Sequence, residues 1–206
     1  MLLMTISLQN LGKRFNREWI FRQLNYHFIS GKSYAITGPN GSGKSTLLQV
    51  IAGSATLSEG KIIYENVKID DVYKYISIAA PYLELVEEMT LTEFLNFHSG
   101  LKNLLPAITS KQIISTLNFE KEANKQIRYF SSGMKQRVKL AQAIFSDVPV
   151  VLLDEPATNL DTEGISLYKN LVNDYCKARL LIVSSNDKQE YDFCDEVLKM
   201  EEYKNV

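Results

Sequence analysis

The spacing of hydrophobic and polar positions changes along the chain, and its N-terminal part is typical of short strands. Between Thr5 and about Ile78, runs rich in β-branched and aromatic residues alternate with turn residues. The predicted strands are Ile6–Leu8, Trp19–Phe21, Ser33–Thr37, Lys61–Tyr64 and Tyr75–Ile78. A helix is predicted to interrupt them, opening near Gly43 and running through Ile51. This part of the chain is therefore predicted to consist mainly of short strands, with one helix after the strand Ser33–Thr37.

From about Thr90 to Phe145 the spacing becomes helical. Apolar positions recur three and four residues apart on one predicted face, beginning with Leu91, Phe94, Leu95 and His98. Thr90 and Glu93 have the spacing of a capping box at the start of this stretch. The pattern predicts a helical insert.

Two continuous apolar runs follow the insert, Val148–Leu153 and Leu180–Val183, and each ends in polar residues. Such runs are typical of strands buried on both faces of a parallel sheet. The pattern therefore predicts an α/β core with a parallel sheet, interrupted by a helical subdomain.

A glycine-rich loop joins the predicted strand Ser33–Thr37 to the first helix. It fulfils G-x-x-x-x-G-K-[ST] in the strand, loop and helix context of a P-loop NTPase. Glycines let backbone N–H groups converge on a phosphate, and the helix N-terminus adds partial positive charge. The predicted nucleotide-binding residues are Gly38, Pro39, Asn40, Gly41, Ser42, Gly43, Lys44, Ser45 and Thr46. Lys44 is expected to reach the β- and γ-phosphates and Ser45 to ligate Mg²⁺. The alternative is a glycine-rich turn that happens to contain a lysine.

Two adjacent carboxylates, Asp154 and Glu155, end the run that begins at Val148. In a parallel sheet this end lies beside the expected phosphate loop. Asp154 is then placed to hold Mg²⁺, and Glu155 to orient or deprotonate the attacking water. The alternative is a pair of solvated acids at a strand end.

Composition narrows the classes of partner. The 206 residues carry a formal net charge of -1, so there is no basic excess for wrapping nucleic acid. No run approaches the ~20 apolar residues of a membrane span, and the apolar start stops at Thr5, short of a signal-peptide core. Cys176 and Cys194 have no metal-ligand spacing and are expected to pack as free thiols. We expect a cytoplasmic protein.

The segment Phe130–Arg137 reads F-S-S-G-M-K-Q-R and resembles the LSGGQ-x-Q-R signature of the ATP-binding cassette (ABC) ATPase family. Met134 stands where the signature usually has its last glutamine, and Ser132 where it has a glycine. The resemblance covers nearly the whole chain. It implies that Ser131 and Gly133 cap the γ-phosphate bound to a second subunit, so that a homo- or heterodimer holds ATP at its interface.

Two weaker matches follow the family's order along the chain. Thr158–Asp161 resembles the loop that contacts the partner subunit. Phe15 stands at the place of the family's adenine-stacking aromatic residue. Its basic neighbours Lys13 and Arg14 are expected to be exposed, which disfavours burial of the ring. Trp19 is the competing aromatic residue, but it falls within the next predicted strand, where core packing is expected.

The chain departs from the family where a glutamine normally contacts Mg²⁺ and the attacking water. Pro81, or Ala80 if the register slips, stands there, and neither side chain has an oxygen. The nearby acids Glu84, Glu87 and Glu88 are candidates for replacing that contact, although a solvated face is the simpler interpretation.

The second departure is Asn186, which stands where the family has a switch histidine. Its amide can donate a neutral hydrogen bond to the γ-phosphate, but not the charge-assisted bond of an imidazolium. The difference is of order 1 kcal/mol, or roughly a several-fold to tenfold slowing. The alternative is that Asn186 and Asp187 form a turn and cap a helix over Gln189–Val197.

The resemblance implies an α/β P-loop NTPase fold with a mainly parallel sheet, an N-terminal antiparallel β subdomain and an inserted helical subdomain. It implies one ABC ATPase domain over residues 1–206, with an α/β catalytic core at 1–80 and 145–206 and a helical signature subdomain at 81–144. It implies the cofactors ATP and Mg²⁺, and separate transmembrane permease subunits on which the protein sits at the inner face of the cell membrane. The function implied is ATP hydrolysis coupled to transport. The alternative is a slow or inactive regulatory cassette that closes on ATP without turning it over.

Overall fold

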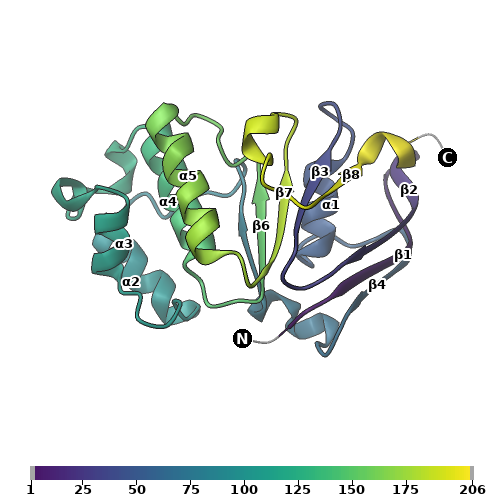
Figure 1. The fold of residues 1–206 in the computed structure, drawn as a ribbon, viewed down its shortest axis with the longest axis horizontal. Coiled ribbons are helices and arrows are strands. Elements are labelled where there is room, and N and C mark those ends of the chain that lie inside the picture. Colours follow the sequence, from purple (N-terminus) through teal and green to yellow (C-terminus); the bar gives the residue numbers. More distant parts are fainter. Residues whose placement is uncertain (1–2, 205–206) are drawn as a thin grey trace. The chain divides into compact units, whose positions relative to one another are not determined.

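The computed structural model describes residues 3–204. Its strands are β1 (Ile6–Phe15), β2 (Glu18–Phe28), β3 (Ser33–Thr37), β4 (Glu59–Tyr64), β5 (Ile76–Ala79), β6 (Val150–Asp154), β7 (Leu180–Ser184) and β8 (Glu196–Lys199). Its α-helices are α1 (Lys44–Ile51), α2 (Leu91–Leu101), α3 (Ser110–Thr116), α4 (Ser132–Ile144) and α5 (Thr162–Tyr175) (Figure 1). Short 3₁₀ helices lie at Ile69–Lys74, Glu120–Glu122, Ile127–Tyr129, Lys188–Glu190 and Met200–Tyr203. Among the described residues, no helix combines the length and the apolar character needed to cross a membrane.

The chain divides into two compact units. The first, here called the sheet unit, comprises the described residues of Met1–Ile78, Val148–Glu155 and Lys177–Val206. The second, the helical unit, comprises Ala79–Asp147 and Pro156–Cys176. The helical unit thus takes in α5, which the sequence-based subdivision places with the catalytic core, because α5 packs against α4.

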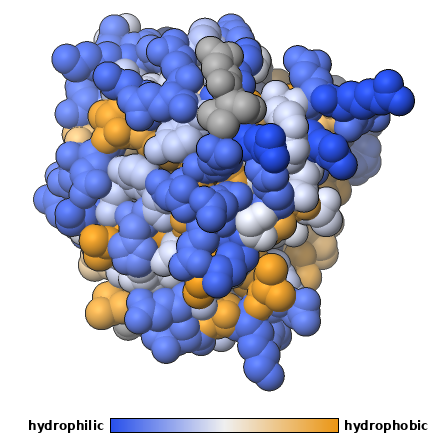
Figure 2. All heavy atoms as spheres, turned by 90° about the vertical axis from the view of Figure 1, so that its right-hand side faces the viewer, coloured by the Kyte–Doolittle hydropathy of each residue, from blue (hydrophilic) through white to orange (hydrophobic). Residues whose placement is uncertain are grey.

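The sheet unit contains an antiparallel sheet with the order β2-β1-β4. Strand β1 continues well past the predicted Ile6–Leu8, with a register shift at Asn10, whose φ of 46° is left-handed. An irregularity of this kind hides the second half of a strand from a period-two pattern. Hydrophilic side chains dominate the face in Figure 2, and hydrophobic ones are scattered over it.

The core of the sheet unit joins this antiparallel sheet to α1 and the parallel strands. Phe28 and Tyr34 pack edge to face with their ring centroids 5.0 Å apart, and Leu47, Leu48 and Ile51 of α1 are fully buried in the same cluster. Burial of each such side chain contributes about 1.5–3 kcal/mol. The position of α1, and with it the loop before it, is therefore set by the core.

The helical unit begins with the predicted capping box. Thr90 Oγ1 accepts a hydrogen bond from Glu93 N–H, while the Glu93 carboxylate accepts one from Thr90 N–H. Thr109 and Gln112 repeat the arrangement at α3. The capping prediction for α2 is confirmed.

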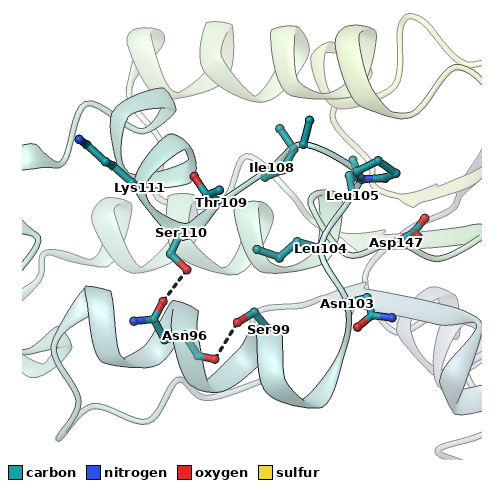
Figure 3. A pocket seen from close by; sticks show the side chains of 12 residues that line it. Asn96, Ser99, Asn103, Leu104, Leu105, Ile108, Thr109, Ser110, Lys111 and Asp147 are labelled. Carbon is teal, nitrogen blue, oxygen red and sulfur yellow. Dashed lines mark hydrogen bonds between the residues drawn. The ribbon is translucent and has the colours of Figure 1, made fainter.

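Between α2 and α3 lies an open hollow of about 730 Å³, where the Ser110 hydroxyl donates to Asn96 Oδ1 at 2.7 Å (Figure 3).

The second sheet of the sheet unit has the order β5-β6-β7-β3-β8, and β6, β7, β3 and β8 run parallel. Ser184 of β7 pairs with Asp154 of β6 on one side and with Ile36 of β3 on the other. The carboxyl ends of these three strands therefore lie in one row. Strand β3 ends at Thr37, one residue after Ile36, and the glycine-rich loop follows. The predicted α/β class with a mainly parallel sheet is confirmed.

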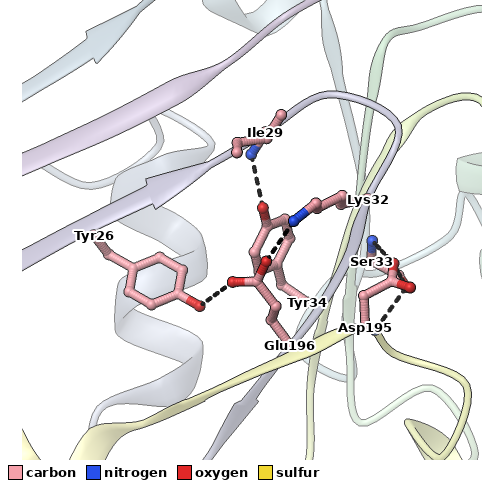
Figure 4. A network of polar contacts seen from close by, with 7 residues as sticks. All are labelled: Tyr26, Ile29, Lys32, Ser33, Tyr34, Asp195 and Glu196. Atoms are coloured by element: carbon pink, nitrogen blue, oxygen red, sulfur yellow. Dashed lines mark hydrogen bonds and ion pairs between the residues drawn. The ribbon is translucent and has the colours of Figure 1, made fainter.

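The alternative in which Asn186 and Asp187 cap a helix predicted that helix over Gln189–Val197. This prediction is wrong. Asp187 caps only the 3₁₀ helix at Lys188–Glu190, and Glu196–Lys199 is strand β8 beside β3. Side chains tie this strand to the sheet unit, as Figure 4 shows. The Asp195 carboxylate accepts from Ser33 N–H at 2.8 Å, and Glu196 accepts from Lys32 at 2.8 Å. These partners lie more than 160 residues away in the sequence, so the local pattern does not show them.

Candidate functional site

The glycine-rich loop connects β3 to α1 as predicted, and its backbone requires glycine at specific points. Gly38 and Gly43 have φ values of 146° and 96°, which L side chains rarely adopt. A Cβ atom on Gly43 would lie 2.5 Å from Ile20 Cγ2. Gly43 is the N-cap of α1 and offers no side chain to the first turn. The first N–H groups of α1 therefore remain available for an anion.

Lys44 is the first residue of α1, directly after this loop, and is only 5% exposed. Its ammonium donates to Gly38 O at 2.8 Å and to Pro39 O at 3.4 Å. The loop therefore encloses the charge that a phosphate group would meet. Lys44 also lines a hollow of about 240 Å³, together with Asn40, Gly41, Gly43, Ser45, Thr46 and Glu155.

The two predicted carboxylates differ in their surroundings. Asp154 is 1% exposed, and its Oδ1 atom has no hydrogen-bond partner among the described residues. Glu155 follows it with a left-handed φ of 44°, and its N–H donates to Ser184 O at 2.8 Å. This backbone turn is strained for a residue with a side chain. It separates the two acids, so that Asp154 stays in the sheet while Glu155 lines the hollow.

A second unpartnered oxygen lies next to Asp154. Ser184 Oγ is fully buried without a hydrogen-bond partner in the described part of the chain, and Ser184 is the cross-strand neighbour of Asp154. Sequence reasoning missed this residue, although a polar residue ending an apolar strand is a signal for it. An unpaired buried oxygen costs about 1–3 kcal/mol, which a bound ligand can offset.

Asn186 lies against the glycine-rich loop. Its Oδ1 accepts from Gly38 N–H at 3.3 Å, and its Nδ2 donates to Asn40 Oδ1 at 3.2 Å. The residue predicted to replace the switch histidine therefore contacts the loop itself.

The two candidate adenine-stacking residues have different environments. Phe15 is 51% exposed, with Lys13 Nζ 4.8 Å from its ring centroid. Trp19 is half-buried, and the guanidinium groups of Arg14 and Arg22 lie 5.5 and 4.5 Å from its ring. The expected core packing of Trp19 is therefore wrong, because the ring is only half-buried and lies beside two guanidinium groups.

The expected exposure of Lys13 is also wrong. Lys13 is buried, because its ammonium donates to Thr56 O at 2.6 Å. The Phe15 ring, which the same ammonium approaches, is nevertheless exposed.

The signature-like segment begins α4 in the helical unit. Ser131 is the N-cap, and its Oγ accepts from Met134 N–H at 3.2 Å. A Cβ atom on Gly133 would lie 2.8 Å from Asn159 O, so this position accepts only glycine without a shift. The Thr158–Asp161 loop thus packs directly on the start of α4.

The position of the missing glutamine also lies in the helical unit. Lys139 of α4 donates to Pro81 O at 2.9 Å and to Ala80 O at 3.4 Å, a contact that the sequence did not indicate. Glu87 pairs with Lys135, whereas Glu84 and Glu88 are exposed. The backbone at Ala80 and Pro81, where the chain differs from the family, is therefore held by Lys139.

The donor set for a metal is incomplete without a nucleotide. Within residues 3–204, no group of three His, Cys, Asp or Glu side chains could hold a metal ion. The unpartnered Asp154 Oδ1 and the Ser45 hydroxyl nevertheless supply hard oxygen donors of the kind that Mg²⁺ prefers. These residues fit an ion that takes its remaining ligands from phosphate and water.

Comparisons with known proteins agree with this geometry. A family model described as ABC transporter matches residues 21–158. The uncharacterized ABC transporter ATP-binding protein YybJ of Bacillus subtilis is 30% identical over 203 residues, which are 95% of this chain and 92% of that protein. The lantibiotic transport ATP-binding protein SrtF of Streptococcus pyogenes is 29% identical, over 88% of this chain and 79% of that protein.

A solved structure gives the same fold. The dimeric structure of a bacterial ABC transporter cassette has a TM-score of 0.79 and 24% identity, over 95% of this chain and 94% of that one. Together with the strand, loop and helix geometry of the glycine-rich loop, these similarities show that the chain belongs to the ABC transporter family, as one of its ATP-binding subunits.

Proposed function

We propose that this chain hydrolyses ATP to ADP and phosphate and thereby drives transport by separate membrane-spanning subunits. The observation that carries the proposal is that Glu155 and Lys44 line one hollow. Glu155 directly follows β6, whose last residue, Asp154, is buried and has an unpartnered oxygen among the described residues. A base, a phosphate-binding cation and a metal-binding carboxylate are the parts that phosphoryl transfer to water needs.

The phosphate groups are proposed to bind the loop residues Gly38–Thr46. The Lys44 ammonium has three donors, and it would exchange its carbonyl partners for phosphate oxygens. Ser45 and Asp154 would hold Mg²⁺, which when bound neutralises charge on the β- and γ-phosphates. The exposed Phe15 ring is proposed to stack on adenine.

Glu155 is proposed as the general base. Its carboxylate would accept a proton from a water molecule while the oxygen of that water bonds to the γ-phosphorus and the bond to the β-phosphate oxygen breaks. The bond from Glu155 N–H to Ser184 O supports this role, because it fixes the backbone from which the side chain enters the hollow.

Dimerisation is proposed to complete each site. Ser131 Oγ uses its lone pair to cap α4, so its O–H can donate outward, and Gly133 N–H belongs to the free first turn of the same helix. Both would contact the γ-phosphate held by a second copy or by a related chain. The dimeric cassette of similar fold supports this arrangement.

The transport partner is proposed to be a separate pair of membrane-spanning permease subunits, with this chain at the inner face of the cell membrane. The transport named for the relative SrtF supports this proposal. No binding to nucleic acid is expected, because the net charge of -1 provides no basic excess.

The test is MgATP hydrolysis by the purified chain at high concentration, compared with Glu155→Gln. We expect hydrolysis in the parent to fall by at least about 10²-fold in Glu155→Gln, because the general base is lost. The control is Glu65→Gln, which neutralises an exposed acid after β4 and should retain full activity. Hydrolysis that survives in Glu155→Gln would refute the assigned base.

A regulatory cassette that closes on ATP without turnover remains the second candidate, favoured by the absence of a side-chain oxygen at Ala80 and Pro81. Size exclusion in ATP separates the two. A parent that dimerises with ATP but hydrolyses none, even at high concentration, would support the regulatory function over hydrolysis.

A further inference from the structure

The Asn186 amide touches the phosphate loop at two points. Its Oδ1 accepts from Gly38 N–H at 3.3 Å, and its Nδ2 donates to Asn40 Oδ1 at 3.2 Å. These partners flank Pro39, so the amide spans the first three residues of the loop. From the sequence, Asn186 is expected to act on the γ-phosphate, and a contact with the loop itself has a different consequence.

The segment that carries Asn186 is held on both sides. Ser185 N–H donates to Ile36 O at 3.1 Å, which fixes it to the end of β3. Asp187 N–H donates to Ser185 Oγ at 2.9 Å, and Asp187 caps the 3₁₀ helix that follows. The amide is thus presented to the loop by backbone that is itself bound to the neighbouring strand.

The Gly38 peptide is restrained from both ends, but only one restraint is independent of the nucleotide. Gly38 O accepts from Lys44 Nζ at 2.8 Å, and this ammonium is the group that the phosphates require. The tie from Asn186 uses a neutral amide. It can persist when Lys44 turns to phosphate, and it then holds Gly38 at its unusual φ of 146°.

We propose that Asn186 is a positioning residue that holds residues 38–40 of the loop in their phosphate-binding conformation, and that it acts on the binding of every nucleotide with a β-phosphate. The inference rests on the proposed nucleotide binding at this loop. It predicts an effect on ADP as large as that on ATP, because the loop binds the phosphates that both share. A contact to the γ-phosphate would affect ATP alone.

The experiment measures the affinity of the purified chain for MgATP and MgADP by calorimetry, using the hydrolysis-deficient Glu155→Gln background for ATP. Asn186→Ala removes both hydrogen bonds, and we expect both affinities to fall by the same factor, about three- to tenfold. In the otherwise native chain, KM should rise by a similar factor while kcat at saturating ATP changes less than about twofold.

Asn40→Ala provides the second variant. Of the two hydrogen bonds that Asn186 makes, this change removes the one from Nδ2 and leaves the one to Oδ1. Asn40 is exposed, so folding should not be at risk. We expect a smaller loss for both nucleotides. Combined with Asn186→Ala it should add little, because the two residues share one contact. The matched control, Gln189→Ala, truncates an exposed amide three residues from Asn186 and should change neither affinity.

The outcomes separate the inference from the proposed function. If Asn186→Ala leaves the affinity for ADP unchanged but weakens ATP binding or reduces kcat, the positioning role is overturned in favour of a γ-phosphate contact. Unchanged affinities for both nucleotides would also overturn the positioning role. A parent that binds neither nucleotide removes the basis of both proposals. A parent that binds both nucleotides without hydrolysis, with equal losses in Asn186→Ala, would support the inference while refuting hydrolysis.

Discussion

Arg137 Nη2 donates to Asp161 Oδ1 at 2.8 Å, so the helix that carries the signature is joined to the residue that begins the next helix. The same Asp161 oxygen accepts from Gly164 N–H at 2.8 Å. These hydrogen bonds hold the pKa of Asp161 below its usual value, with the larger contribution from Gly164 N–H. One carboxylate thus caps α5 and anchors it to α4 within the helical unit.

Replacement of Arg137 should loosen this connection. The Arg137 side chain is only 12% exposed, so Arg137→Met keeps its apolar stem packed while removing the guanidinium group. We expect the melting temperature to fall by a few degrees and ATP-dependent dimerisation to weaken. Thermal unfolding and size exclusion in ATP measure the two effects. An Arg137→Met protein that matches the parent in both would show that the ion pair is dispensable.

Two glycines in helices of the helical unit should respond oppositely to alanine. A Cβ on Gly133 would lie 2.8 Å from Asn159 O, whereas a Cβ on Gly100 of α2 meets nothing within 4 Å. Gly133→Ala should therefore destabilise the fold by about 1–3 kcal/mol through overpacking. Gly100→Ala should stabilise it by about 0.4–1 kcal/mol, since alanine favours the helix. Urea unfolding measures both, and a stabilised Gly133→Ala would mean that the Thr158–Asp161 loop shifts freely.

The left-handed backbone at Glu155 should lower the stability of the protein, compared with a residue that tolerates this conformation. Its φ is 44°, and an L residue with a Cβ pays about 1–2 kcal/mol for this conformation, whereas asparagine adopts it more readily. Glu155→Asn should therefore raise the free energy of unfolding by up to about 1 kcal/mol relative to Glu155→Gln, while both variants lose hydrolysis. Both changes remove the same charge, so equal stability of the two variants would contradict the strain.

His98 should make the fold sensitive to mild acid. Its Nε2 lies 3.0 Å from Ser146 Oγ and its Nδ1 3.3 Å from Gln142 Nε2. Burial, and then the charge of Lys102, lower the pKa of His98. In the unfolded chain His98 takes up a proton as the pH falls through about 6.5, whereas in the folded chain it stays neutral to lower pH. The free energy of unfolding should therefore fall as the pH drops below about 6.5.

The measurement compares urea midpoints at pH 7.5 and 5.5 for the parent and His98→Gln. The parent should lose more stability than the variant over this interval, because only the parent has the buried imidazole. An equal loss in the two proteins would assign the acid sensitivity to other groups.

Local chemistry allowed much of the candidate site to be predicted. The glycine-rich loop was evident from the sequence because its glycines, Lys44 and Ser45 stand at fixed spacing within one strand, loop and helix. The Thr90 capping box and the position of Asp154 and Glu155 at the end of β6 likewise depend on neighbours in sequence. The resemblance of Phe130–Arg137 to the ABC signature indicated the family, and the comparisons confirmed that the chain belongs to it.

The tertiary structure alone decided contacts between distant residues. Asn186 meets Gly38 across 148 positions of sequence, and β8 is a strand because β3 supplies its partner. Trp19 is flanked by guanidinium groups from both β1 and β2, which no periodicity could reveal. Spacing along the chain determines hydrogen bonds made within a few residues, whereas these contacts depend on which strands become neighbours when the core is buried.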